Sequence, residues 1–209
     1  MPSLSSYDFG KKSFEGRRFL ADVEATQEAM QTLMAPIYEF NATCRKNGKK
    51  LYRPRQILTL GNHEQRILRA VEQDAKLEGV LTIDALGYTG FGWEVYPFLD
   101  VVIVDDVAYS HYFVTGVAGR PAASARAQLL KTHMSAIAGH QQGLQIATGN
   151  KADGTLITNI IAGSCYEHDE SYMGPQGNKH WRGILVLHEV NNGSFDLMPV
   201  SLAYLNKKY

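Results

Sequence analysis

An adjacent amide and imidazole, Asn62 and His63, follow an apolar segment at residues 56–60 and the single glycine Gly61. The pair combines an oxygen donor with a group that exchanges protons near neutral pH. A helical pattern at 65–76 begins directly afterwards, so we expect the pair at the carboxyl end of a strand, where open α/β sheets bind ligands. A simpler interpretation is that Asn62 only caps the helix, because asparagine is a good N-cap residue.

Other histidines occur in similar places. His111 lies near the end of an apolar segment at 107–113, and His140 follows Gly139 after a further short apolar segment. Folding can bring such strand ends to one rim of a sheet, although they are far apart in the sequence. Imidazole together with amide or carboxylate oxygen suits Mn, Fe or Zn. The sequence therefore predicts a metal site at this rim.

The elements that must position these residues follow from hydrophobic spacing. We expect a loop at 1–13, a long helix at 14–41, a short helix at 82–86 and a helix at 122–131. Besides the strand at 56–60 and a short one before Gly139, strands are expected at 101–104 (a buried one), 107–113, 144–148, 155–162, 183–190 and 195–203. Helices come early and antiparallel-looking strands late, which predicts an α/β fold with a mixed, sandwich-like second half.

Two of these segments need an interpretation of their own, as part of the core or as part of a site. The first helix carries an apolar stripe that we interpret as core packing, formed by Phe19, Val23, Met30, Leu33, Met34, Ile37 and Phe40. The polar segment 165–181 is long enough to be functional, and it is expected either to line a substrate cleft or to be a surface loop.

Composition limits the class of protein. The chain has 209 residues with 44% hydrophobic content, which favours a single domain. Its 21 acidic and 21 basic residues balance, so no overall field indicates a nucleic-acid or membrane partner. The two cysteines, Cys44 and Cys165, form neither a disulfide framework nor a zinc cluster. With no apolar run of about 18 residues and no signal peptide, we expect a cytoplasmic protein.

The order of these motifs resembles that of the calcineurin-like metallophosphoesterases. Gly61-Asn62-His63-Glu64, then His111, then Gly139-His140 match the later part of the family pattern DxH, GDxxD, GNH(D/E), H, GHxH. Trp181-Arg182-Gly183 before a strand is also similar to members carried by bacteria and phages. The resemblance implies a mixed-sheet phosphoesterase sandwich flanked by helices.

The family pattern also implies a role for each matching residue. Asn62, His111 and His140 would bind the second of two metal ions (Mn, Fe or Zn), and His63 would protonate the leaving-group oxygen. Arg66 could face the phosphate, or it could be a solvent-facing helix residue. The implied reaction is hydrolysis of a phosphoester, with nucleic acid or nucleotides slightly favoured as substrates, by a hydroxide that bridges two metals.

The chain departs from the pattern in two places. No DxH and no GDxxD precede Asn62, so we expect a partial domain over 1–209 that begins after the second motif and lacks the first strands. Gln142 stands where the pattern has a second histidine, and an amide oxygen is a poorer ligand for borderline metals than imidazole. Gln142 is therefore a candidate for either metal or substrate binding.

Two other functions stay open. A non-catalytic binding or assembly protein could keep the phosphoesterase fold and at most one metal, which the missing carboxylates and Gln142 favour. The intact Asn62-His63 pair disfavours it, because a scaffold needs no general acid. An unrelated α/β binding domain with coincidental motifs is the third interpretation.

These departures predict that the 209-residue chain hydrolyses phosphoesters weakly or not at all. A chain extended upstream to include GDxxD should be active, because the bridging carboxylate would be restored. Assays of both forms on bis-p-nitrophenyl phosphate with Mn²⁺ test this. Equal, robust turnover by the two forms would contradict the expected loss.

Overall fold

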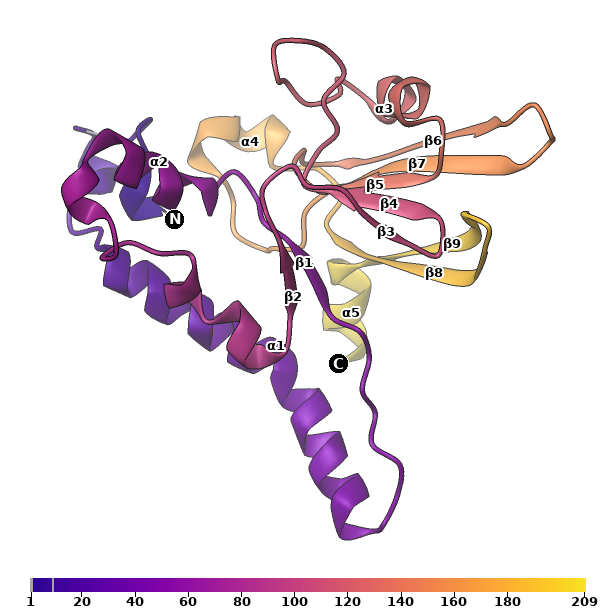
Figure 1. Cartoon of the computed structure of the whole chain (residues 1–209), viewed down its shortest axis with the longest axis horizontal. Coiled ribbons are helices and arrows are strands. Elements are labelled where there is room, and N and C mark those ends of the chain that lie inside the picture. The colour runs from indigo at the N-terminus through magenta and orange to yellow at the C-terminus, as the bar shows by residue number, and fades with distance from the viewer. Residues whose placement is uncertain (1, 9) are drawn as a thin grey trace. The chain divides into compact units, whose positions relative to one another are not determined.

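The computed structural model describes residues 2–8 and 10–209 (Figure 1). The chain forms two compact units, Met1–Phe98 and Leu99–Tyr209. It is a mixed α/β protein, as the sequence predicts. Residues 1 and 9 of the expected first loop lie outside the described residues, and the rest of that loop includes the short 3₁₀ helices Pro2–Leu4 and Lys12–Phe14. In the part of the chain that is described, no helix is both long and apolar enough to cross a membrane.

The first unit is built on the long helix α1 (Phe19–Lys46), which starts and ends later than the predicted 14–41. The start is delayed because Gly16 has a φ of +77°, a left-handed conformation that an α-helix cannot contain. The helix stops before Gly48, whose φ of +61° has the same effect at the other end.

The apolar stripe on α1 is only partly buried. Val23 and Met34 are 8% and 3% exposed, whereas Leu33 and Phe40 are 58% and 55% exposed. The interpretation of the stripe as core packing is therefore wrong for Leu33 and Phe40. Met34 lies one position further round the helix than Leu33, on the side that the unit covers.

Strand β1 (Ile57–Thr59) forms where the sequence predicts it and pairs in parallel with β2 (Glu94–Tyr96). Strand β2 was not predicted, because only three residues follow the glycine-rich stretch before the chain turns away. Helix α2 (Gln65–Gln73) follows β1 but is shorter than predicted. It ends at Asp74, whose carboxylate accepts a hydrogen bond from the Lys76 amide at 3.1 Å and starts a separate 3₁₀ turn.

The core of the first unit joins helices α1 and α2 to the segment between α2 and β2. Val23, Ile67 and Leu86 form its buried centre. That segment contains the 3₁₀ helices Ala75–Leu77, Asp84–Leu86 and Tyr88–Phe91, of which the second matches the predicted helix at 82–86. The partly buried residues around this centre are Leu4, Phe19, Leu81, Ile83, Ala85 and Tyr88.

The second unit contains a five-stranded sheet with the order β3-β4-β5-β7-β6. Its strands are β3 (Val102–Val104), β4 (Val107–Ser110), β5 (Ala136–Ala138), β6 (Leu144–Asn150) and β7 (Leu156–Ala162). The central strands β4, β5 and β7 are parallel, and the edge strands β3 and β6 are antiparallel to their neighbours. The late strands are thus less antiparallel than the sequence indicated.

Strand β3 corrects a further prediction. A run of valine and isoleucine at 101–104 suggested a strand buried on both faces, yet Val101 is 50% and Ile103 is 56% exposed. The reason is its place at the edge of the sheet, where only Val102 points into the core.

Helix α3 (Ala125–Thr132) matches the helix predicted at 122–131 and begins at Ser124, whose hydroxyl accepts from the Ala127 amide at 3.2 Å. It packs on β6 and β7 from one side of the sheet, and the β8–β9 hairpin lies on the other side (Figure 1). The hairpin strands are β8 (Gly183–Asn191) and β9 (Ser194–Ser201).

The chain ends in helix α5 (Leu202–Lys208), where the sequence predicted the end of a strand. The hydroxyl of Ser201 accepts from the Tyr204 amide at 3.1 Å and so caps this helix. The segment between β7 and β8 also contains short helices, Ser171–Met173 and α4 (Gly174–Gly177).

A buried polar network joins α3 to strands β5 and β7. Asn159, which is 0% exposed, donates to the Met134 carbonyl at 2.7 Å and accepts from Thr132 at 3.1 Å. Gln128, which is 1% exposed, donates to the carbonyls of Ala136 and Ile160 at 3.0 and 3.4 Å. These side chains are themselves buried, and their amides find hydrogen-bond partners on the main chain around β5 and β7.

Replacing Asn159 or Gln128 by alanine should lower the free energy of unfolding of the second unit by about 1–3 kcal/mol each, because each change removes hydrogen bonds between buried groups. Urea unfolding followed by circular dichroism measures the change. The matched control is Asn150→Ala at the exposed end of β6, which should alter stability by less than about 0.5 kcal/mol. If all three variants lost a similar amount of unfolding free energy, the buried network would contribute no more to stability than an exposed side chain does.

Candidate functional site

The second unit brings His111 and His140 together. His111 follows the last residue of β4, and His140 comes two residues after β5, the neighbouring parallel strand. The main-chain carbonyl of His111 accepts hydrogen bonds from the amides of Gly139 and His140, at 3.1 and 3.0 Å. These bonds extend the pairing of β4 with β5 and hold both histidines at the carboxyl ends of their strands.

The two imidazole rings approach through their nitrogen atoms. His111 Nε2 lies 2.9 Å from His140 Nδ1, and the ring centres are 4.8 Å apart. The pair therefore shares one proton along this line, with one ring donating and the other accepting. When a metal ion replaces that proton, the two nitrogens present converging lone pairs and form a partial ligand set for a borderline metal.

Burial lowers the pKa of His140 below its ordinary value of 6.5. The neutral ring is the form that coordinates metal, so the surroundings of His140 favour the ligating form. The ring of Tyr112 lies beside both imidazoles, with its centre 5.0 Å from that of His140 and 5.7 Å from that of His111. Sequence reasoning did not select Tyr112.

Asn62 and His63 lie in the turn between β1 and α2 in the first unit. Asn62 is half-buried and His63 is exposed. The residue that precedes α2 is Glu64, in a helical conformation and without a side-chain cap, so the structure does not place Asn62 at the N-cap of this helix. The simple capping interpretation of Asn62 is therefore wrong.

Glu64, the last residue of the Gly61–Glu64 motif, holds this turn in place. Its carboxylate accepts a hydrogen bond from the Gly61 amide at 2.9 Å, and the Gly61 carbonyl accepts from the Gln65 amide at 3.1 Å. Tyr88 also hydrogen-bonds to Glu64, and burial together with that carboxylate raises the pKa of Tyr88 well above its ordinary value. The acidic residue of the motif thus has a structural partner in the core.

Arg66 lies in the first turn of α2 and is half-buried. Burial, followed by the positive charge of Arg69, lowers the pKa of Arg66 from its ordinary value. This leaves the guanidinium charged at neutral pH, because arginine does not lose its proton in proteins. The half-buried position of Arg66 is compatible with either interpretation, a residue that faces a bound phosphate or one that faces solvent.

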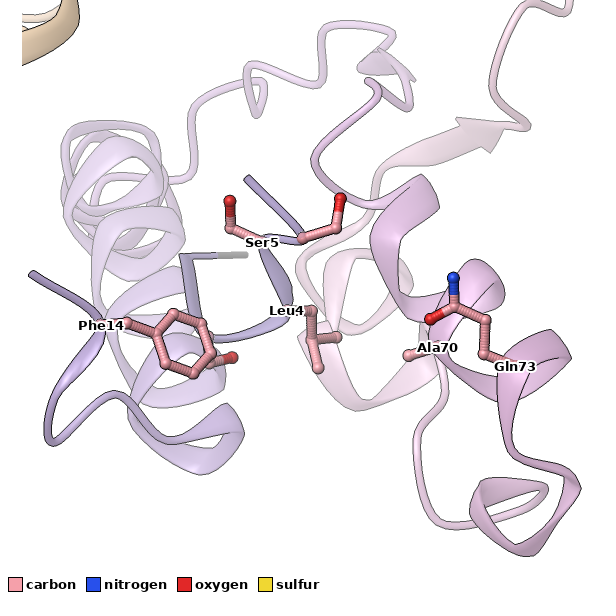
Figure 2. Close-up of a pocket in the computed structure, with 7 residues that line it drawn as sticks. Leu4, Ser5, Phe14, Ala70 and Gln73 are labelled. Atoms are coloured by element: carbon pink, nitrogen blue, oxygen red, sulfur yellow. The ribbon is translucent and has the colours of Figure 1, made fainter. Parts of the chain in front are cut away.

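A hollow of about 390 Å³ lies next to α2 in the first unit. Figure 2 shows Phe14 and Gln73 on opposite sides of it, with Leu4 between them. Its lining contains Ser3, Leu4, Ser5, Ser6, Phe14, Ala70 and Gln73. None of the residues predicted to bind metal or substrate belongs to this hollow.

Gln142, two residues after His140, contacts the segment 165–181. Its side-chain nitrogen donates to the hydroxyl oxygens of Tyr172 and Tyr166, at 2.7 and 3.3 Å. The segment was predicted either to line a cleft or to be a surface loop, and these bonds bring it against the last motif. The tyrosines could have been noticed only as aromatic residues in an otherwise polar stretch.

The segment 165–181 is closed at its base. Ser164 and Arg182 form a β-bridge, and the Arg182 guanidinium donates to the Glu167 carbonyl and to the Asp169 carboxylate. His180 Nδ1 donates to the Gly177 carbonyl at 2.8 Å, which leaves Nε2 to accept from the Ser164 hydroxyl at 2.7 Å.

The donor set fits a metal ion only in part. Among residues 2–8 and 10–209, no three or more His, Cys, Asp or Glu side chains gather in a way that could hold a metal ion. His111 and His140 are two imidazole donors in one unit, while Asn62, His63 and Arg66 belong to the other unit. The carboxylate-bridged pair of metals that the resemblance implies has no matching ligand cluster in the described chain.

Comparison of the chain with protein-family models, with curated proteins and with solved structures gives no match. A functional assignment therefore depends on the motifs and on the geometry of their residues.

The burial of Tyr88, together with its contact with Glu64, predicts a pH dependence of stability. Because the pKa of Tyr88 is raised in the folded chain, the unfolded chain loses this proton first as the pH rises. The free energy of unfolding should thus fall above the ordinary tyrosine pKa of about 10. Urea unfolding at increasing alkaline pH measures this fall. Tyr88→Phe should make it shallower, and the exposed Tyr7→Phe should not.

Proposed function

We propose that the chain is a metal-dependent phosphoester hydrolase of the calcineurin-like type, with weak or no activity. The observation that carries the proposal is the approach of His111 Nε2 to His140 Nδ1, 2.9 Å apart at the ends of adjacent parallel strands. The motif order assigns both residues to one metal, and their convergence supports that assignment. On this proposal the mixed sheet, with helix α3 on one side and the β8–β9 hairpin on the other, forms part of a phosphoesterase sandwich.

The chemistry follows from the character of each residue. His111 and His140 would hold one divalent ion (Mn, Fe or Zn), and Asn62 would add an amide oxygen. When bound, such an ion supplies charge neutralisation at the phosphoryl oxygens and a hydroxide at neutral pH. His63 would give its proton to the leaving-group oxygen, a role that an exposed imidazole can perform because it can reach a bound substrate. The roles given to Asn62 and His63 are inferred from the sequence motif alone.

Substrates of the proposed reaction are phosphodiesters, with nucleic acid or nucleotides favoured. Arg66 supports this weakly, since a half-buried guanidinium one turn from His63 suits an anionic oxygen. No carboxylate cluster accompanies the histidine pair in the described residues, so the weak activity is an expected consequence of the donor set.

A non-catalytic binding or assembly protein is the second candidate. The contacts of Gln142 favour it, because its side-chain nitrogen donates to the hydroxyls of Tyr166 and Tyr172 and so gives the residue a structural role. A side chain engaged in this way stabilises the segment 165–181 and needs no role in catalysis. Metal binding without hydrolysis would support this second function.

Substitutions of the histidine pair test the metal site. His111→Ala and His140→Ala should each weaken Mn²⁺ or Zn²⁺ binding at least about tenfold, because each removes a ligand. Isothermal titration calorimetry of the purified chain measures the affinity, and metal analysis of the isolated protein provides a second readout. His188→Ala, at an exposed position on β8, is the control and should leave binding unchanged.

The same variants separate the two candidate functions. Hydrolysis of bis-p-nitrophenyl phosphate with Mn²⁺ should be lost with His140→Ala. His63→Ala should reduce it about 10²–10⁴-fold and leave metal affinity intact. Undetectable turnover in a metal-loaded chain would favour the binding protein. Metal affinity that does not change in either ligand variant would refute the site itself.

A further inference from the structure

The hollow next to α2 has walls of unlike character. It lies within the first unit, and its volume of about 390 Å³ falls in the range of about 300–1,000 Å³ found for small-molecule sites. Phe14 lines one side, Ala70 and Gln73 line the other, and Leu4 lies between them (Figure 2). An aromatic ring, aliphatic groups and a side-chain amide together suit a flat heterocycle, which can stack on the ring and hydrogen-bond at its edge.

Two of the hydroxyls that line the hollow can only accept hydrogen bonds from a ligand. The Ser3 hydroxyl donates to the Asp22 carboxylate at 2.6 Å. The buried Ser5 hydroxyl hydrogen-bonds to the Asp8 carboxylate. A hydroxyl has a single proton, so both oxygens offer only lone pairs to the hollow, whereas the Gln73 amide can both donate and accept. This set of groups suits a ring with an amine beside a ring-nitrogen acceptor, which is the arrangement of N6 and N7 in adenine.

The segments around the hollow carry an excess of positive charge, although the whole chain is balanced. Residues 1–18 and α2 contain six basic and three acidic residues, and Asp22 of α1 adds a fourth acid. One of these acids, Asp8, is already paired with Lys11 and Arg17, at 3.1 and 3.3 Å. Arg66 lies close to this segment, because the charges of Asp8 and Arg17 both act on it. The local field therefore favours an anionic ligand.

Helix α2 sets the distance between the hollow and its cation. Arg66, Ala70 and Gln73 are spaced by four and three residues, which puts them on one side of the helix. A rise of about 1.5 Å per residue places Arg66 about 6 Å along the axis from Ala70, one turn beyond the lining of the hollow. The ribose of a nucleotide bridges a gap of this size between its base and its phosphate, and a guanidinium can bind two phosphate oxygens at once.

We propose that the hollow binds the adenine base of a single nucleotide whose phosphate lies on Arg66. The base stacks on Phe14, and its N6 and N7 edge meets the Gln73 amide and the serine oxygens. The phosphate then lies one turn from His63, whose carbonyl accepts from the Arg66 amide at 3.3 Å. That this nucleotide is the substrate of hydrolysis rests on the proposed function, whereas its binding depends on the first unit alone and needs no metal ion.

Isothermal titration calorimetry of the full chain in EDTA tests the site with four probes. These are adenosine monophosphate (AMP), inosine monophosphate (IMP), adenosine and inorganic phosphate. AMP should bind at least about fivefold more tightly than IMP, which has a carbonyl in place of the N6 amine. It should also bind more tightly than adenosine or phosphate, because each of these keeps only one of the two contacts. Equal affinities for AMP and IMP, or for AMP and phosphate, would refute the adenine site.

Variants of the two contacts test the geometry. Phe14→Ala should weaken AMP binding about fivefold to 150-fold through the loss of stacking, and Phe14→Trp should restore it. Phe40→Ala is the matched control, because Phe40 is 55% exposed on α1 and outside the hollow. Arg66→Ala should weaken the binding of AMP but not of adenosine, and the exposed Arg53→Ala should change neither.

Circular dichroism of each variant should show that its helix content is retained. Equal effects of Phe14→Ala and Phe40→Ala on AMP affinity would overturn the proposal. Because EDTA removes metal ions, the outcome is independent of catalysis. A chain that hydrolyses phosphoesters with Mn²⁺ but binds no AMP in EDTA would refute this site alone, and a chain that binds AMP without any hydrolysis would refute only the proposed function.

Discussion

The geometry of the second unit depends on two buried amides, those of Gln128 and Asn159. Parallel strands need a crossover helix to cover them, and polar groups buried between that helix and the sheet need hydrogen-bond partners within the protein. The two side chains donate to the main-chain carbonyls of Met134, Ala136 and Ile160. They thereby fix β5, a strand of only three residues, between β4 and β7. The position of His140 follows from this, because the loop that carries it leaves the end of β5.

Local patterns in the sequence were sufficient for elements that have local signals. The helix at 122–131 was predicted from the run that follows the loop with Gly116, Gly119 and Pro121, and in the structure it begins at Ala125, after the Ser124 cap. The terminal helix carries a similar signal at Ser201, yet its apolar residues suggested a longer strand instead. The order of the sheet has no local signal at all. Strand β7 lies between β5 and β6 in the sheet. Strand β5 therefore pairs with β7 and not with β6, the strand that follows it in the sequence.

In the candidate site, too, features set by neighbouring residues could be predicted, whereas contacts between segments far apart in the sequence could not. The sequence indicated that His111 and His140 end apolar segments, and the parallel pairing of β4 with β5 brings these ends together. The role of Glu64 could also have been inferred from its spacing. It stands three residues after Gly61, and at the start of a helix a glutamate in this position often accepts a hydrogen bond from the main-chain amide of the first residue. The contacts of Gln142 could not, because Tyr166 and Tyr172 reach it from a segment whose path has no periodic pattern.

The closed base of the segment 165–181 has a consequence for how such a chain can diversify. The Gly183 amide donates to the Ser164 carbonyl at 2.9 Å, so the two ends of the segment stay side by side whatever lies between them. Loops with fixed ends tolerate insertions and replacements at small entropic cost. Evolution can therefore exchange the content of this loop, and with it the groups around Gln142, while the strands that carry the histidines keep their register. Related chains should differ most in sequence within the segment 165–181 and least at the two ends that hold it in place.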